Sequence, residues 1–147
     1  MRIFIIALTL MAPFYTYSGK VPDSKSNENG QWVAQSTASI NNLSEEQKLA
    51  LEDKSKKGDA EASFRLYRYY CFTMNDINGQ MKYLKISASQ GNIAAQYNYG
   101  VSLSDVNPVF SKYYDLDEAI YWIKLAVKNG DNHAKSKLEE LNKLKGK

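Results

Sequence analysis

The chain has 147 residues, a length suited to one ordinary domain. Its 19 basic and 16 acidic residues are mixed along the chain and leave a net charge of +3, which excludes the clustered basic face of a typical nucleic-acid binder. The single cysteine, Cys71, excludes an internal disulfide, so we interpret it as a small apolar core side chain and expect packing to stabilise the fold.

The N-terminus has the pattern of a signal peptide. A short basic start, MR, precedes the apolar run IFIIALTLMAPF and the small residues Thr16 and Ser18. The run is shorter than the ~20 residues that span a bilayer, so no stable membrane insertion is expected after cleavage. We predict a signal peptide over residues 1–18, cleavage near Ser18, and a periplasmic or secreted location.

Residues 19–42 are rich in Ser, Asn and Gly and predict a flexible polar leader, although Trp32 and Val33 are apolar exceptions. The helical domain is expected over residues 43–147. Its first helix is predicted to begin at the capping box SEEQ, in which Ser44 and Gln47 satisfy each other's backbone amides, and to end near Lys57.

Three glycines mark an internal repeat. Gly58, Gly91 and Gly130 are each followed by Asp or Asn, a favourable N-cap, and by alanine four residues after the glycine. Each glycine is predicted to end the preceding helix in a left-handed conformation.

The segments before the second and third glycines share one plan. DINGQMKYLKISASQG and DLDEAIYWIKLAVKNG both open with an acidic cap and carry an aromatic residue eight positions before the glycine. Repetition at 33 to 39 residues predicts stacked helical hairpins. We expect an all-α fold, a short α-solenoid with hairpins at residues 58–90 and 91–129 and a capping helix on each side.

These residues resemble the Sel-like repeat family, which is related to tetratricopeptide repeats. DLDEAIYWIKLAVKNG is similar to the family pattern through Asp115, Ala119, Trp122, Ala126 and Gly130, and GNIAAQYNYG through Gly91, Ala95 and Gly100. The first repeat departs from it, because Tyr67 stands at the position of the helix-pair glycine. The resemblance covers about residues 44–142.

The resemblance implies a protein-binding module of bacterial origin. Small exported members of the family are proposed immunity proteins against effectors such as lipases, which implies a toxin effector as the partner. A structural adaptor for envelope protein complexes is the alternative, and a small envelope hydrolase is a competing class. A monomer and a weak end-to-end dimer both stay open.

No motif in the chain supplies a catalytic constellation. With one histidine, His133, and one cysteine, no conventional zinc site is available. Asp115, Asp117 and Glu118 are interpreted as charges that favour a helix N-terminus. We therefore expect no enzymatic activity, no cofactor and no metal.

Binding residues are expected on the first helix of each hairpin, the helix that lines the binding face in such solenoids. Tyr and Arg dominate binding hot spots. The candidates on these helices are Arg65, Arg68, Tyr69, Tyr97 and Asn98, while Tyr70, Tyr83 and Tyr99 are expected in the core.

The second hairpin carries an insertion, NPVFSKYY, before its second helix. Insertions in repeats map to loops, often on the binding face. Phe110, Tyr113 and Tyr114 either contact a partner or fold back over Tyr99 or Trp122. In the first case, shortening the loop leaves the melting temperature nearly intact and weakens binding.

Overall fold

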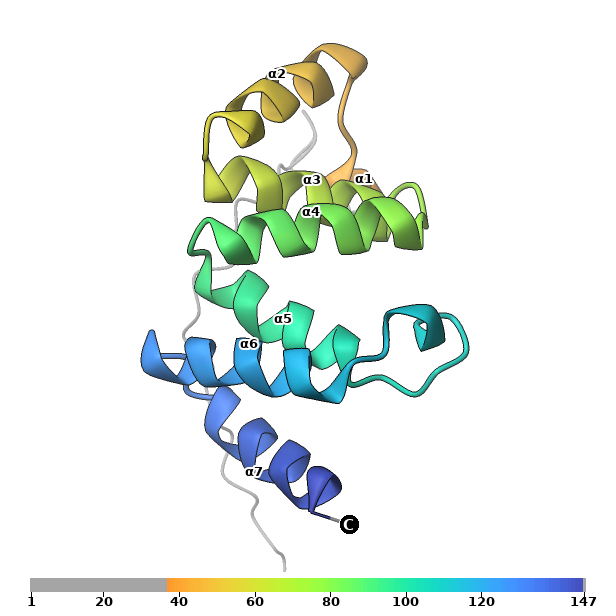
Figure 1. Ribbon diagram of the computed structural model, residues 1–147. Coiled ribbons are helices and arrows are strands. Elements are labelled where there is room, and N and C mark those ends of the chain that lie inside the picture. The colour runs from red at the N-terminus through yellow and green to blue at the C-terminus, as the bar shows by residue number, and fades with distance from the viewer. Residues whose placement is uncertain (1–36, 147) are drawn as a thin grey trace, which may run out of the picture. The chain divides into compact units, whose positions relative to one another are not determined.

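A computed structural model describes residues 37–146, and these residues form seven α-helices and one short 3-10 helix (Figure 1). The predicted signal peptide, residues 1–18, and the leader up to residue 36 lie outside this range. The elements are α1 (Thr37–Asn41), α2 (Glu45–Lys56), α3 (Ala60–Phe72), α4 (Ile77–Ser89), α5 (Ile93–Leu103), η1 (Ser111–Tyr113), α6 (Leu116–Lys128) and α7 (Ala134–Lys145). No strand occurs within residues 37–146, and the predicted all-α class is confirmed.

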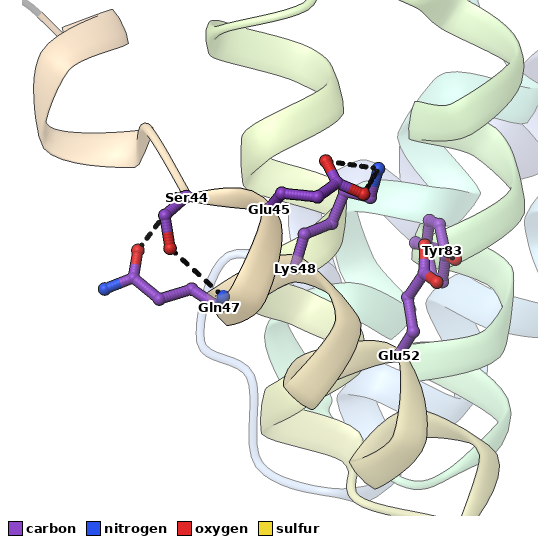
Figure 2. A network of polar contacts seen from close by, with 6 residues as sticks. All are labelled: Ser44, Glu45, Gln47, Lys48, Glu52 and Tyr83. Carbon is purple, nitrogen blue, oxygen red and sulfur yellow. Dashed lines mark hydrogen bonds and ion pairs between the residues drawn. The ribbon is translucent and has the colours of Figure 1, made fainter.

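Local polar side chains begin most of these helices. At α2, Ser44 Oγ accepts from the Gln47 amide at 3.2 Å and the Ser44 amide donates to Gln47 Oε1 at 2.9 Å, which is the predicted capping box (Figure 2). Asp59 caps α3 and Asn92 caps α5, as predicted. Asp115 accepts from the Glu118 amide at the start of α6.

Helix α7 begins later than expected. Asp131 was the predicted N-cap, but the helix starts at Ala134 and His133 occupies the cap position. Asp131 Oδ1 nevertheless accepts from the amides of His133 and Ala134, at 2.8 and 3.0 Å. The carboxylate therefore satisfies the first free amides from one turn further back.

The three repeat glycines adopt the left-handed conformation that was predicted. The φ angles are +95° at Gly58, +100° at Gly91 and +97° at Gly130. No heavy atom would crowd a Cβ at any of the three, so the requirement for glycine comes from the backbone alone.

The helices stack in chain order from α2 to α7 (Figure 1). Within residues 37–146, the closest packing joins α3 to α4 and α5 to α6, and these pairs are the two predicted hairpins. Helix α4 packs on α5, α2 on α3, and α7 on α6. The core lies between these helices, and its fully buried apolar side chains include Leu66, Leu84, Ala95, Ala119, Ile123, Ala126 and Leu141.

Each hairpin brings its two helices together through a different glycine. In the second hairpin, a Cβ on Gly100 would lie 2.7 Å from Ile123 Cγ1, so this glycine allows α5 to approach α6. In the first hairpin, a Cβ on Gly79 of α4 would lie 2.3 Å from Tyr70 Cδ1. The contact glycine thus lies on the first helix of the second hairpin but on the second helix of the first hairpin. In the first hairpin, the space beside it holds the Tyr70 ring of α3.

Amide side chains join each hairpin to the helix before it. In the first junction, Gln90 Nε2 donates to the Ser55 carbonyl at 2.7 Å, and Gln90 Oε1 accepts from Ser63 Oγ at 2.6 Å. In the second junction, Gln96 Nε2 donates to the Ala88 carbonyl at 3.3 Å, and Gln96 Oε1 accepts from Asn129 at 2.9 Å. The first bridge combines Ser63 near the start of its hairpin with Gln90 at the end, whereas the second combines Gln96 near the start with Asn129 at the end. The longer side chain therefore comes from opposite ends of the two hairpins.

Helix α1 corrects the expectation of a flexible leader through residue 42. Residues 37–41 are helical and pack against α3, and Asn41 is buried. The physical reason is Arg65 of α3, whose guanidinium donates to the Ile40 carbonyl and to Asn41 Oδ1, at 3.0 and 3.1 Å. Composition alone cannot reveal this contact, because the partner lies 24 residues further along the chain.

Candidate functional site

Five of the predicted binding residues lie on α3 and α5, the first helices of the hairpins. Arg65, Arg68 and Tyr69 belong to α3, whereas Tyr97 and Asn98 belong to α5. All five side chains are half-buried. Tyr97 packs against the hydrophobic core, so its ring contributes to stability as well as to the surface.

Tyr69 is held by an aromatic cluster on the first hairpin. Its ring meets Tyr70 edge-on at a centroid distance of 5.3 Å, and Tyr70 stacks on Tyr83 at the same distance. Tyr83 is buried, in agreement with its predicted core position, whereas Tyr70 is only half-buried. This cluster limits the conformations of Tyr69 before any partner arrives.

Arg65 is the most constrained of the predicted residues. Its hydrogen bonds to Ile40 and Asn41 both go to neutral oxygen atoms at the end of α1. Burial, and then the charge of Arg68, lower the pKa of the Arg65 guanidinium. No ion pair involves Arg65 or Arg68 within residues 37–146.

An open hollow lies beside Arg65, between α2 and α3. Its volume is about 360 Å³. The lining residues are Asn42, Leu43, Gln47, Ala50, Leu51 and Arg65. Arg65 is the only charged side chain among them, so an otherwise apolar and amide-lined surface carries one guanidinium.

The insertion before α6 is an ordered loop. The amides of Asn107 and Val109 donate to the side chains of Asp105 and Asn107, at 2.9 and 3.0 Å. The 3-10 helix η1 follows, and the Asp115 amide returns to the Leu103 carbonyl at 2.9 Å. These bonds close the loop at the point where α5 ends and α6 begins.

Two of the three predicted aromatic residues of the insertion fold back. Phe110 and Tyr113 are half-buried and pack against the core, as the packing alternative describes. Tyr114 is 45% exposed and is the one that still faces solvent. Because two aromatic rings of the loop join the core, shortening it should lower the melting temperature, contrary to the expectation from sequence.

Asn78 of α4 fastens the insertion to the first hairpin. Its Oδ1 accepts from the Tyr113 hydroxyl at 2.7 Å and from Lys112 Nζ at 2.5 Å. Lys112 Nζ also lies 4.9 Å from the Tyr113 ring centroid. The loop of the second hairpin is therefore held against the start of the second helix of the first.

Exposed apolar side chains occur in two segments at this end of the hairpins. They come from the turn between α3 and α4 and from the insertion, which lie on the same side of the stack (Figure 1). The members are Phe72, Met74, Val106, Val109 and Tyr114, and Val106 is 81% exposed. We call this group the loop edge.

The sequence prediction included Tyr114 but missed the other four members of the loop edge. The available signal was two valines flanking the turn residues Asn107 and Pro108, where polar residues are usual. Phe72 and Met74 had no such signal, because a helix end with apolar residues is equally compatible with burial.

A second contact region joins α2 to α4. The Tyr83 hydroxyl donates to Glu52 Oε1 at 3.2 Å (Figure 2). Burial, and then the Glu52 carboxylate, raise the pKa of Tyr83 to about 12. The phenol is thus neutral at physiological pH and acts as a hydrogen-bond donor that fixes α2.

The carboxylates at the start of α6 have structural partners. Asp115 caps the helix, Asp117 pairs with Lys145, and Glu118 pairs with Lys85 at 3.1 Å. Glu118 Oε1 also accepts from Trp122 Nε1 at 3.2 Å. Among residues 37–146, no group of three or more His, Cys, Asp or Glu side chains could hold a metal ion.

Stacked helical hairpins with an anchored loop edge define the chain as an all-α helical-repeat protein. The chain is 61% identical to the uncharacterized protein YibG of Escherichia coli (strain K12) over 110 residues, which are 75% of this chain and 72% of that protein. The chain therefore belongs to the family of YibG. No family model matches the sequence, and no solved structure matches it. No helix within residues 37–146 has the length and apolar character needed to cross a membrane.

Proposed function

We propose that the chain is an exported protein-binding module of the Sel-like, tetratricopeptide-related class. The observation that supports this role is the loop edge. Large apolar side chains exposed together on a soluble domain commonly mark a protein contact. Val106, Val109 and Tyr114 stand on a loop that is anchored through Tyr113, so a partner would bind a surface that is already ordered.

The specific role that we propose is neutralisation of a toxic effector, such as a lipase, in the periplasm. It rests on the resemblance of the repeats to those of exported immunity proteins and on the signal-peptide pattern of residues 1–18. A chain that lacks residues 1–18 should fail to protect cells from an effector delivered to the periplasm. Full protection by this cytoplasmic form would contradict the periplasmic role.

The binding role is tested by placing charges on the loop edge. The double variant Val106→Asp, Val109→Asp should weaken binding of the cognate effector at least about 10-fold, because a buried, unpaired carboxylate is costly at an interface. Calorimetric titration measures the affinity, and thermal unfolding should change little because both side chains are exposed.

Ile93→Asp is the matched control for the loop-edge variant. Ile93 is 39% exposed and begins α5, whereas the insertion follows the other end of that helix. The control should bind like the wild-type chain. Equal affinity of all three proteins, or an equal loss in the control, would contradict a binding role for the loop edge.

A further inference from the structure

Helix α1 holds the Arg65 side chain in place without neutralising its positive charge. The guanidinium has five N–H donors, and its bonds to Ile40 and Asn41 use the two terminal nitrogen atoms. Both acceptors are neutral. The contact therefore fixes the orientation of the guanidinium and leaves its positive charge uncompensated.

The usual helical partner of Arg65 is engaged elsewhere. Glu61 lies four residues before Arg65, the spacing at which a helical ion pair forms. Glu61 instead accepts from Asn92 Nδ2 at 3.3 Å, and no ion pair to Arg65 occurs in the described part of the chain. Arg68, one turn further on, adds a charge of the same sign.

The surface around Arg65 favours one kind of ligand. Leu43, Ala50 and Leu51 provide apolar contact in the 360 Å³ hollow, and Arg65 provides its only charge. A second hollow of about 260 Å³ shares Leu51 and Arg65, and its other lining residues, Lys54, Asp59, Glu61 and Ala62, include charges of both signs. The first hollow is therefore the one in which an acidic group meets only a positive charge.

We propose that the hollow between α2 and α3 binds an acidic side chain, flanked by an apolar residue, on the partner protein. The carboxylate takes the N–H donors of Arg65 that α1 does not use, in the forked geometry that guanidinium groups favour. The neighbouring apolar side chain covers Leu43 and Leu51. This inference rests on the proposed protein-binding function and names the chemistry of a second contact.

The probe is a pair of short peptides, Ac-Leu-Glu-Leu-NH2 and Ac-Leu-Gln-Leu-NH2, that differ only in charge. Nuclear magnetic resonance of the Arg65 side chain in the whole protein should show saturable shifts with the glutamate peptide. Binding of the glutamine peptide should be about 10-fold weaker or more, as expected when a charge-assisted hydrogen bond is lost. Equal affinity for the two peptides would overturn the proposal.

Two substitutions at the site extend the test. Arg65→Gln removes the charge and should reduce binding of the glutamate peptide about 10-fold. Asn41→Asp keeps the length of the side chain that contacts Arg65 and adds a carboxylate, so it should block the peptide by pairing with Arg65 inside the chain. Undiminished binding by Asn41→Asp overturns the proposal even where Arg65→Gln has disturbed α1.

Lys124→Gln is the charge-matched control, since Lys124 is exposed on α6. It should bind the glutamate peptide like the wild-type chain, and an equal loss in this control would mean that only the net charge matters. Inorganic phosphate at the same concentration should not displace the peptide. Displacement would assign a general anion site and overturn the proposal.

The outcome is distinguishable from failure of the proposed function. A partner effector that binds the wild-type and Arg65→Gln chains equally would overturn this site and leave the binding role intact. Peptide binding with the expected charge dependence, together with no effector binding, would support the site and contradict the proposed function.

Discussion

Two equivalent positions of the two hairpins carry residues of very different size. Tyr70 and Leu103 both lie 12 residues after a repeat glycine, while Gly79 and Glu118 both lie 12 residues before one. The first hairpin combines a large ring with glycine, and the second combines a smaller side chain with glutamate. In the first hairpin, the space beside Gly79 holds the Tyr70 ring, as close packing requires.

We predict that Gly79→Ala destabilises the fold by about 1–3 kcal/mol, because the added methyl overlaps the Tyr70 ring. Urea unfolding measures the loss. The double variant Gly79→Ala, Tyr70→Leu should recover much of it, since leucine occupies the corresponding site in the second hairpin. No recovery in the double variant would show that backbone displacement, not the ring, is the cause.

Alkaline pH should weaken the fold through its buried tyrosines. Burial raises the pKa of Tyr67 to about 12, with Cys71 contributing second, and Tyr83 is raised to the same value. An unfolded tyrosine loses its proton near pH ~10. Between about pH 10 and 12 the folded chain holds protons that the unfolded chain releases, so stability falls as pH rises.

The measurement is the urea midpoint of unfolding at about pH 9, below the pKa of an unfolded tyrosine, and at about pH 11, above it. The midpoint should be lower at the higher pH. Tyr83→Phe should show a smaller difference between the two conditions, because one of the titrating groups is removed. A midpoint that does not change with pH would contradict this prediction.

At the scale of the helix, caps and ends could be predicted from the sequence, whereas contacts between helices could not. The capping box at Ser44 and the positive φ at Gly91 depend on neighbours within a few residues. The Tyr113 bond to Asn78 spans 35 residues and the Arg65 bond to Asn41 spans 24. Periodicity fixes which face of a helix is apolar, but it carries no information about which polar group lies opposite.

In the candidate site too, some residues could be predicted from the sequence and others could not. Choosing Arg65 and Tyr114 required only residue type and repeat position, and both lie on surfaces that a partner can reach. Phe110 and Tyr113 had the same residue-type signal but join the core, because the loop bends back toward α4. Only the three-dimensional path of the loop separates the two outcomes.

The amide bridge between the two hairpins should contribute measurably to stability. Gln96→Leu removes the side-chain partner of Asn129 and one of the partners of the Ala88 carbonyl, which still accepts from the Gly91 amide, and should cost about 1–3 kcal/mol in urea unfolding. Gln80→Leu is the matched control, because Gln80 is also buried but its side chain makes no hydrogen bond within residues 37–146. Equal effects would assign the cost to altered packing.

Across the whole molecule, most stability should lie in the middle of the stack. Helix α4 buries seven residues, whereas α2 buries only Ser55 and α7 buries only Ala134 and Leu141. Helices that contact few neighbours open first when stability is a sum of nearest-neighbour contacts. Both ends of the described stack are therefore less protected than its centre.

Native-state hydrogen exchange should show this gradient. Amides of α4, α5 and α6 should exchange only on global unfolding, while those of α2 and α7 should exchange through local opening of lower free energy. Urea dependence separates the two, because local opening exposes little surface. Identical opening free energies in all helices would indicate one cooperative unit.

The two amide bridges place different demands on the helix that precedes each hairpin. In the second bridge, Gln96 and Asn129 belong to one hairpin and the partner on α4 is the Ala88 main-chain carbonyl. In the first bridge, Ser63 Oγ also lies 2.7 Å from Ser55 Oγ, so a side chain of α2 takes part. Every amino acid offers a main-chain carbonyl, so the hydrogen bonds of the second joint leave the residue type at position 88 to packing alone, whereas those of the first joint select a hydroxyl group at position 55.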